Sequence, residues 1–412
     1  MKVLLGNKFF YHRGGAESVF FDTTDLLEKK GHKVISFSMK HPRNYPSPYE
    51  KYFISNVDYK QRGFKNRVNS SLKALYSFEA KTKIEELIKK EKPDIAHLHN
   101  TYHQISPSIL HTLKKFNIPI VLTLHDYKMV CASYLMLCRG KVCEACRDGR
   151  YYSCFLKGCA ANSGVKNLVN TIEMYLHHRV LNIYDLVDIF IAPSRFLKNK
   201  LEEMGFRKKI VFLPYLIKSD EISPEYNWTE KSIVYFGRLT NEKGLFTLLD
   251  AVKKIKGVTV KIIGEGPREE DIRTKLRIEK IWNVKLLGYK SGSELESEIK
   301  KSMFSILPAE YYDNSPRAII ESMAIGKPVV GSRIGGIPEL IRDNETGLTF
   351  EPGNAKDLRA KIEYLVNNQD QIVKMGKNAR SFVEKELNAD KHYNRLMGIY
   401  NQAIGIRLQG KL

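Results

Sequence analysis

Two stretches in the second half of this 412-residue chain combine charged residues and glycine in a way that suits phosphate binding. The first is Gly237-Arg238-Leu-Thr-Asn-Glu242-Lys243-Gly244, which follows an apolar run and opens a helical pattern. Gly237 lets a ligand approach the backbone, Arg238 can grip phosphate with its planar guanidinium, and Lys243 adds a point charge. Each alone would be an ordinary surface residue, but together, after a strand, they predict a phosphate site.

The second stretch, residues 307–328, predicts a helix that begins just beyond the end of a strand. Ser315 is a natural N-cap, Pro316 suits the first helical position, and Gly326 suits the C-terminal stop. In open α/β sheets, ligands bind in the crevice at the carboxyl ends of the strands, where free N–H groups of a helix attract phosphate oxygens.

Glu321 falls on this predicted helix among apolar neighbours such as Ile320 and Met323. A carboxylate without a partner is unfavourable there. One interpretation is an i,i+4 ion pair with Arg317, although this charge order is the less favourable one. We prefer the other interpretation, which is contact with a ligand.

Three glycine motifs and one histidine provide weaker signals. Gly264-Glu-Gly266 and Gly335-Gly336 follow apolar runs, where glycine permits turns that larger residues resist. Gly14-Gly15 precedes a helical pattern and would either admit a ligand between two domains or form an ordinary turn. His125-Asp126 closes a strand-like run, so His125 would hydrogen-bond a substrate hydroxyl or phosphate, or be a satisfied structural histidine beside Asp126.

All six cysteines lie in one short segment, which favours a metal site over a disulfide framework spread through the fold. The spacing Cys143-x2-Cys146-x7-Cys154-x4-Cys159 offers four thiolates, as tetrahedral Zn²⁺ requires, and Cys138 is a possible substitute. With no histidine inside the cluster, a closed structural site is favoured over a catalytic one. The alternative is a set of free buried thiols, because disulfides are disfavoured in the cytosol.

The elements that must position these residues are short apolar runs that alternate with helical patterns. Continuous β-branched runs fit parallel sheets covered on both faces, so the sequence predicts an α/β fold with doubly wound domains. The expected strands of the first half are 3–5, 34–37, 95–98, 118–124 and 189–192, with a helix over 16–30. Those of the second half are 233–236, 258–263, 284–287, 304–307 and 328–330, with a helix over 245–256.

The length and the 43% hydrophobic content predict two domains with large cores. We place the first at 1–215, with a Cys-rich insertion at 131–159, and the second at 216–390. Residues 391–412 read as a C-terminal helix. No window reaches about 18 consecutive apolar residues and the start lacks a signal-peptide pattern, so we expect a cytosolic protein.

The net charge of +21 fits either solvated lysine-rich faces or anionic partners. Between Lys51 and Lys92 there are eleven Lys or Arg residues against five Asp or Glu residues. Such a stretch could meet anionic lipid, phosphorylated substrates or nucleic acid. Charge alone does not choose among these partners.

Taken in order, the motifs resemble those of glycosyltransferase family 4 over nearly the whole chain. The likeness rests on Gly14-Gly15-Ala-Glu17, His125-Asp126, Gly237-Arg238-x4-Lys243-Gly244, Gly264-x-Gly266, the acidic-x7-Glu segment from Asp313 to Glu321, and Gly335-Gly336-x-Pro-Glu339. The resemblance implies the GT-B arrangement of two facing Rossmann-like domains, with the acceptor bound by the first and a nucleotide-diphosphate sugar by the second. It also implies retention of anomeric configuration, no catalytic metal, and a C-terminal helix that crosses back to the first domain.

The resemblance assigns roles to the donor-binding residues of the second domain. Arg238 and Lys243 would neutralise the departing diphosphate, and Glu321 would hold the nucleotide ribose. Asp313 stands where the family normally has Glu and would lie near the donor sugar. Because Asp is one methylene shorter, either the backbone lies closer to the sugar or Asn314 and Ser315 share the role.

Outside these residues, the resemblance implies further contacts and strengthens the zinc prediction. His125 would contact the donor sugar, and Gly14-Gly15 would let the backbone approach the diphosphate and acceptor. Some family members carry a similar Cys-rich insertion, which favours structural zinc here.

The sequence thus predicts a glycosyltransferase of cell-surface polysaccharide or glycolipid assembly that uses a saccharide or lipid-linked acceptor. The basic stretch from Lys51 to Lys92 would face a membrane as a peripheral contact. Two alternatives stay open: a nucleotide-sugar epimerase of similar build, and a zinc-containing nucleic-acid-binding protein, although no nucleic acid is expected as a partner.

Overall fold

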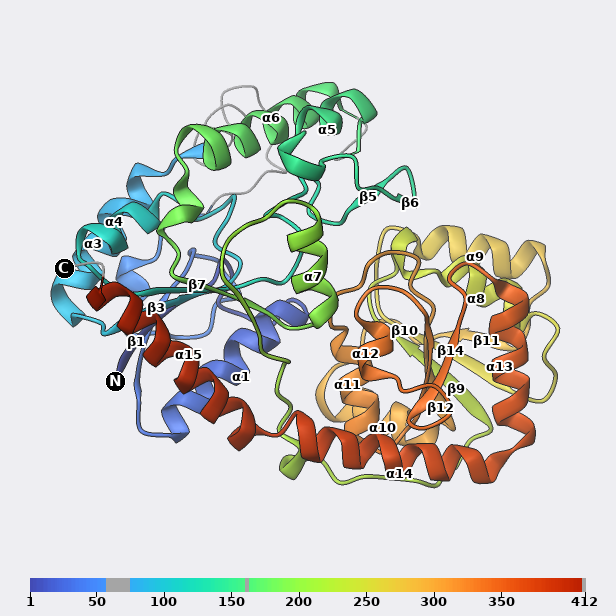
Figure 1. The fold of residues 1–412 in the computed structure, drawn as a ribbon. Helices are drawn as coiled ribbons and strands as arrows, with labels where there is room; N and C mark the ends of the chain where they lie inside the picture. The colour runs from blue at the N-terminus through green and yellow to red at the C-terminus, as the bar shows by residue number, and fades with distance from the viewer. Residues whose placement is uncertain (57–74, 160–162, 410–412) are drawn as a thin grey trace. The chain divides into compact units, whose positions relative to one another are not determined.

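The computed structural model describes residues 1–56, 75–159 and 163–409. The chain divides into two compact units. The N-terminal unit comprises Met1–Cys138, Cys143–Tyr215 and Asp390–Leu412, and the C-terminal unit comprises Arg139–Val142 and Leu216–Ala389. Each is built on one six-stranded parallel sheet flanked by helices (Figure 1), which confirms the predicted α/β class with two Rossmann-like units.

The N-terminal sheet has the strand order β2-β1-β3-β4-β7-β8. Its inner strands β3, β4 and β7 are buried at every position, which explains why they read as continuous apolar runs. The strands are β1 (Lys2–Gly6), β2 (Lys33–Phe37), β3 (Ile95–Leu98), β4 (Ile120–Thr123), β7 (Ile189–Ala192) and β8 (Ile210–Phe212). The helices are α1 (Gly15–Lys29), α3 (Phe78–Glu91), α4 (Ile109–Lys115), α5 (Tyr152–Lys157), α6 (Gly164–Tyr175), α7 (Arg195–Glu203) and α15 (Ala389–Gln409).

The last helix, α15, is part of the N-terminal core although its residues come at the end of the chain. Leu396 and Tyr400 of α15 are fully buried in one apolar cluster with Val3 and Leu5 of β1 and Ile189 of β7. Figure 1 shows α15 running alongside β1 and β3. The core of the N-terminal unit is therefore completed by a helix that begins 177 residues after the end of β8, at Ala389 as against Phe212.

The C-terminal sheet has the order β11-β10-β9-β12-β13-β14, again with all pairs parallel. Its strands are β9 (Ser232–Phe236), β10 (Thr259–Ile263), β11 (Val284–Leu286), β12 (Phe304–Leu307), β13 (Val329–Ser332) and β14 (Gly347–Phe350). Its helices are α8 (Leu245–Val252), α9 (Glu269–Ile278), α10 (Gly292–Lys301), α11 (Arg317–Ala324), α12 (Ile337–Leu340), α13 (Ala355–Asn367) and α14 (Gln369–Glu386). A small two-stranded sheet, β5 (Leu137–Cys138) with β6 (Lys141–Val142), lies in the Cys-rich segment.

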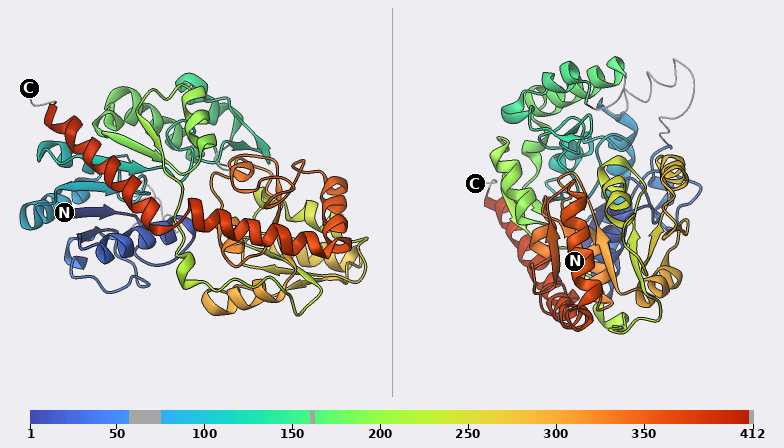
Figure 2. Two further views of the ribbon diagram at one scale, coloured as in Figure 1. Left: turned by 60° about the horizontal axis from the view of Figure 1, so that its bottom comes forward. Right: turned by 90° about the vertical axis from the view of Figure 1, so that its right-hand side faces the viewer.

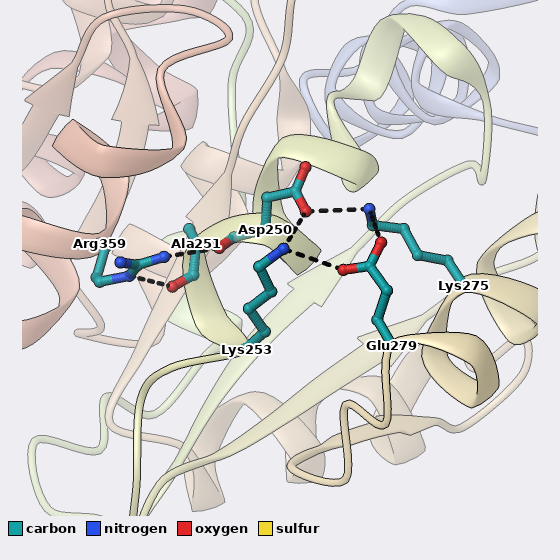
Figure 3. Close-up of polar contacts among 6 residues, drawn as sticks. All are labelled: Asp250, Ala251, Lys253, Lys275, Glu279 and Arg359. Atoms are coloured by element: carbon teal, nitrogen blue, oxygen red, sulfur yellow. Dashed lines mark hydrogen bonds and ion pairs between the residues drawn. The ribbon is translucent and has the colours of Figure 1, made fainter.

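Polar contacts join three helices of the C-terminal unit at the end of α8 (Figure 3). Arg359 of α13 donates to the carbonyl oxygens of Asp250 and Ala251, two acceptors that the last turn of a helix leaves unsatisfied. The Asp250 carboxylate also pairs with Lys253 at 3.2 Å and with Lys275 of α9 at 3.0 Å. These contacts fix α8, and with it the loop that precedes α8.

The predicted strands are all present, but three features of the elements differ from expectation. The strands β8 and β14 were not predicted, because each is a run of only three or four residues at a sheet edge. The predicted capping of α11 is wrong by one residue: the helix begins at Arg317, and Pro316 with an extended backbone is its N-cap. Gly326 does end this helix, with a positive φ of 86°.

Part of the predicted membrane-facing stretch lies outside the described residues. Within Lys51 to Lys92, the structure describes neither residues 57–74 nor the basic side chains they carry. Among the helices that are described, none is long and apolar enough to cross a membrane.

Candidate functional site

The predicted phosphate-binding loops of the C-terminal unit all follow the carboxyl ends of its central strands. Gly237 follows β9, Gly264 follows β10, Asp313 lies beyond β12, and Gly335 lies beyond β13. In the sheet, β9 lies between β10 and β12 (Figure 1), so the strand order reverses beside it. Such a reversal point in an open α/β sheet is where ligands bind.

The glycines of two motifs allow their loops to pack backbone against backbone. A Cβ atom at Gly264 would lie 1.9 Å from the carbonyl oxygen of Gly237, and one at Gly266 would lie 2.3 Å from that of Leu239. No side chain fits at such distances. The Gly264-Glu-Gly266 motif therefore supports the loop that carries Arg238.

Lys243 and Asp313 form an ion pair at the centre of this edge. The Lys243 ammonium lies 2.6 Å from the Asp313 carboxylate and 3.0 Å from the Tyr311 hydroxyl, and little of either charged side chain is exposed. The amide of Gly336 donates to the Asp313 carbonyl oxygen at 2.8 Å, so the Gly335-Gly336 motif fixes the Asp313 backbone. The structure thus brings four of the predicted motifs into one place.

Arg238 differs from Lys243 in that its side chain is 68% exposed. Its nearest acidic neighbour is Glu242, at 3.9 Å. The buried Tyr235 hydroxyl donates to the Arg238 carbonyl oxygen at 2.8 Å and so fixes the backbone that carries the guanidinium. Arg238 is therefore anchored at its backbone, with a cationic side chain that reaches into solvent.

Glu321 is less buried than the sequence predicted. It lies one turn into α11 and its side chain is 33% exposed, while Ile320 and Met323 form the buried face of the helix. Arg317 donates to its carboxylate at 3.3 Å, which is the ion pair that we had ranked second. Asn314 and Ser315, just before the helix, are buried.

In the N-terminal unit, His125 follows β4 and is held at both ring nitrogens. Its Nε2 lies 2.9 Å from Nδ1 of His99, and its Nδ1 lies 2.8 Å from the Tyr215 hydroxyl. Burial, with smaller contributions from His97 and Lys8, lowers the pKa of His125 to about 3. The side chain is therefore neutral at pH 7.

The structure contains the satisfied histidine of the alternative interpretation, although Asp126 is not its partner. The Asp126 carboxylate instead accepts hydrogen bonds from the Tyr102 hydroxyl and from the Lys128 amide. Because His125 and Asp126 are adjacent residues at the end of a strand, their side chains point in different directions and take different partners.

A second pair of hydrogen bonds fixes His97, which stacks on His99 with 4.6 Å between ring centroids. His97 contacts the Tyr400 hydroxyl of α15 at 2.8 Å and the Thr123 hydroxyl at 2.7 Å. His97, His99 and His125 thus form one row, in which His97 and His99 are buried and His125 is half-buried, with a tyrosine hydroxyl at each end.

Gly14-Gly15 stands at the start of α1, after β1. Gly14 has an extended backbone, and a Cβ atom there would meet only the Glu17 carboxylate, at 3.7 Å. Glu17 itself is buried, and burial raises its pKa. Gly14 is thus not required by backbone conformation or close packing, and its predicted approach to a ligand stays a prediction.

Comparisons with known proteins identify the family to which this chain belongs. Residues 13–220, half of the chain, match the family model described as Glycosyltransferase Family 4, and residues 218–382 match Glycosyl transferases group 1. The chain belongs to glycosyltransferase family 4.

Individual relatives agree with this assignment. The glycosyltransferase is 26% identical over 398 residues to an uncharacterized glycosyltransferase of Methanocaldococcus jannaschii, covering 93% of this chain and 94% of that one. It is 32% identical over 177 residues to the amylovoran biosynthesis glycosyltransferase AmsK of Erwinia amylovora, covering 40% of this chain and 44% of AmsK. Its fold is similar to that of Anabaena HepE in complex with UDP and glucose, with a TM-score of 0.69, 14% identity, and coverage of 97% and 99% of the two chains.

The cysteines of this glycosyltransferase are free thiols, three of them buried and three half-buried. Cys154 belongs to a small apolar cluster with Cys146, Tyr151 and Met174, and Cys159 packs against it. In the described part of the chain, no three Cys, His, Asp or Glu side chains are grouped so that they could hold a metal ion. Zinc binding therefore stays a prediction.

Sequence reasoning missed His99, Tyr215 and Tyr311, which the structure places beside predicted site residues. The signal for His99 was available: it follows β3 as His125 follows β4, and these strands are neighbours with His97 opposite Val121. Tyr215 and Tyr311 carry no such signal, because they lie in loops whose path only the three-dimensional structure determines.

Proposed function

We propose that this glycosyltransferase moves a sugar from a nucleoside diphosphate to a hydroxyl of a growing cell-surface polysaccharide or glycolipid, with retention of anomeric configuration. The observation that carries the proposal is the convergence of Lys243, Asp313 and the start of α11 at the carboxyl ends of β9 and β12. Free amides at a helix N-terminus and buried cations are the groups that bind a diphosphate.

In this proposal, the C-terminal unit binds the donor. Lys243 lies at the phosphate position, with Asp313 and Tyr311 holding its ammonium in place. Arg238 then contributes an exposed guanidinium to the same phosphates. Glu321 accepts hydrogen bonds from the nucleotide ribose, while Arg317 donates to its carboxylate and fixes its position.

The proposed chemistry is a front-face displacement. The acceptor oxygen forms a bond to the anomeric carbon as the bond from that carbon to the diphosphate oxygen breaks. The acceptor proton passes to the departing phosphate oxygen, and the cations of Lys243 and Arg238 stabilise the charge that develops there. The neutral His125 contacts the donor sugar through its ring, because His99 and Tyr215 engage both ring nitrogens and fix its orientation.

The choice of substrates rests on the names of the relatives. AmsK is named for amylovoran biosynthesis, and a capsular polysaccharide biosynthesis glycosyltransferase of Staphylococcus aureus is 25% identical over 244 residues. The HepE structures contain UDP, so UDP and UDP-sugars are the first donors to test. The matches named here support neither the epimerase nor the nucleic-acid-binding alternative.

Calorimetric titration with UDP, GDP and ADP tests the donor site directly. We expect one nucleotide to bind wild type and to bind Lys243→Met roughly 10- to 100-fold more weakly, because each hydrogen bond to a charged group contributes about 1.5–3 kcal/mol. The matched control is Lys285→Met, which removes an exposed lysine of β11 and should bind like wild type.

Two outcomes would contradict the proposal. One is equal nucleotide affinity of wild type and Lys243→Met; the other is a new free nucleotide sugar formed without any acceptor, which would favour an epimerase. The retaining part has a separate test, because the anomeric configuration of the isolated product can be read by NMR. A product of inverted configuration would contradict the front-face mechanism but would leave the proposed donor site unaffected.

A further inference from the structure

Two short helices of the N-terminal unit, α5 and α6, expose apolar side chains that neither the sheet core nor the proposed active site uses. Tyr152, Phe155 and Leu156 of α5 are between 46% and 72% exposed. Val165, Leu168 and Ile172 of α6 are between 44% and 74% exposed. We call these six residues the α5–α6 apolar face.

The helix α6 exposes its apolar stripe and buries polar residues, which is the reverse of a helix that covers a core. Val165, Leu168 and Ile172 fall within about 60° of its circumference, since successive residues turn by about 100°. The opposite side is buried and includes the polar residues Asn167 and Thr171. A helix of a monomeric soluble protein normally buries its apolar stripe, so this one is oriented for an apolar partner outside the unit.

The buried polar side chains of α6 are satisfied within the unit, which explains how this orientation is stable. The Asn167 amide donates to the Ser163 carbonyl oxygen at 2.9 Å, and the Thr171 hydroxyl donates to the Asn167 carbonyl oxygen at 2.9 Å. Glu173 is paired with Lys128 at 2.8 Å. The orientation that exposes the apolar stripe therefore leaves these buried polar side chains with partners.

The exposed charges on α5 and α6 themselves are cationic. They are Lys157 and Lys166, and the exposed cations Arg150 and Arg179 flank the two helices. Between residues 150 and 182 the sequence contains only one acidic residue, the buried Glu173, and the first exposed acidic residues outside this range are Asp148 and Asp185. Figures 1 and 2 show α5 and α6 side by side on the outside of the N-terminal unit.

We propose that the α5–α6 apolar face docks on the surface of an anionic lipid bilayer. Adjacent apolar and basic side chains on helices are what binds the boundary between anionic headgroups and acyl chains. A second copy of this chain is a poorer occupant, because a two-fold interface would bring the cations together with no exposed acidic residue between 150 and 182 to pair with them. The inference does not depend on the proposed donor site.

Co-sedimentation of the full-length protein with vesicles tests the inference. We expect binding to phosphatidylcholine mixed with phosphatidylglycerol, weak binding to phosphatidylcholine alone, and loss of binding at high salt. The triple variant Leu156→Gln, Val165→Gln and Ile172→Gln should bind the mixed vesicles with an affinity reduced by about tenfold or more. The matched control is Trp282→Gln, which removes an apolar side chain of the C-terminal unit that is 79% exposed.

The readouts separate lipid binding from other occupants and from damage to the fold. Because the three substituted residues are exposed, the triple variant should keep the unfolding temperature and the nucleotide affinity of wild type. Wild type that ignores anionic vesicles, or a triple variant that binds them equally well, would overturn the inference. A wild-type dimer that the triple variant dissociates, without any vesicle binding, would assign the face to a second copy instead.

Discussion

His99 is the residue that gives His125 its orientation, because the two imidazoles share one hydrogen bond at 2.9 Å. In a neutral imidazole one ring nitrogen donates and the other accepts, so each partner of His125 fixes which tautomer it adopts. The other ring nitrogen of His99 is buried and has no hydrogen-bond partner in the part of the chain that the structure describes. His99 is therefore a positioning residue, not a catalytic one.

Replacing His99 by Ala should lower kcat/KM for sugar transfer by about tenfold or more, because His125 loses the partner that orients its ring. Nucleotide affinity should not change, since the predicted diphosphate site lies in the C-terminal unit. Steady-state kinetics together with calorimetric titration check both statements. Rescue by His99→Asn, whose amide can occupy a similar position, would support positioning; a loss of nucleotide affinity in His99→Ala would contradict it.

For single residues, sequence reasoning was informative where one physical requirement restricts the residue type. The glycines of Gly264-Glu-Gly266 and Lys243 lie at the carboxyl ends of strands, as their motifs indicated, and their ligand contacts stay predictions. For Glu321, the apolar neighbours in sequence did not reveal that the side chain is 33% exposed and lies beside Arg317, and its ligand contact stays a prediction. The partners of His125 were not predictable, since His99 is 26 residues away in sequence.

Among the helices, α6 depends on a buried ion pair for its position. Lys128 and Glu173 are 1% and 2% exposed, and His103 lies 3.3 Å from the same carboxylate. Burial alone would raise the pKa of Glu173, but His103 and Lys128 outweigh it and hold the pKa far below its ordinary value. The carboxylate thus stays charged and joins α6 to the loop that follows β4.

Replacing Lys128 by Met should reduce the free energy of unfolding by about 3–5 kcal/mol, because Glu173 is left as a buried charge. The double variant Lys128→Met with Glu173→Leu should recover most of this loss, because the charge is removed as well. Urea denaturation measures both. As a control, Lys253→Met breaks an exposed ion-pair network at the end of α8 and should leave the free energy of unfolding close to that of wild type.

The Cys-rich segment carries the prediction of structural zinc. Elemental analysis of protein prepared without chelators should find about one equivalent of zinc, and Cys154→Ser should lose it together with stability. Less than about half an equivalent in wild type would count against a four-cysteine site and for the free thiols that the structure contains.

Strands and helices were predictable to the extent that their apolar patterns are long. The inner strands of both sheets are buried on both faces, and their continuous apolar runs identified them. The edge strands β8 and β14 and the start of α11 were not predicted correctly, because short runs and a Ser-Pro pair allow more than one local structure.

In the whole molecule, two residue types are divided between the units. All eleven histidines lie in the N-terminal unit, and both tryptophans, Trp228 and Trp282, lie in the C-terminal unit. Burial is the main cause that lowers the pKa of His125 to about 3, of His178 to about 3 and of His392 to about 4. We therefore expect mild acid to lower the stability of the N-terminal unit through its histidines, whereas the C-terminal unit contains no histidine.

Acidification from pH 7.5 to pH 5 should destabilise the N-terminal unit selectively. Below the ordinary histidine pKa of 6.5 the unfolded chain takes up protons, whereas the folded histidines stay neutral until their lowered pKa values are reached. Stability is thus fully present above pH 6.5 and falls as the pH drops towards 4, by up to about 2 kcal/mol per histidine at pH 5.

Thermal unfolding followed by two probes distinguishes the units. Circular dichroism reports both units, and its first transition should move to lower temperature at pH 5. Tryptophan fluorescence reports the C-terminal unit alone, and its midpoint should move much less. Equal shifts of both probes would contradict the assignment of the acid sensitivity to the buried histidines.

The position of α15 also bears on how the chain folds during synthesis. The apolar side chains of Leu396 and Tyr400, and the hydroxyl that contacts His97, leave the ribosome after the whole C-terminal unit. The C-terminal unit, by contrast, is made from consecutive residues apart from Arg139–Val142. We therefore expect the half that is translated first to reach its native state second, so that a released chain truncated at Ala389 would hold a finished C-terminal unit and an N-terminal unit still open to chaperones and proteases.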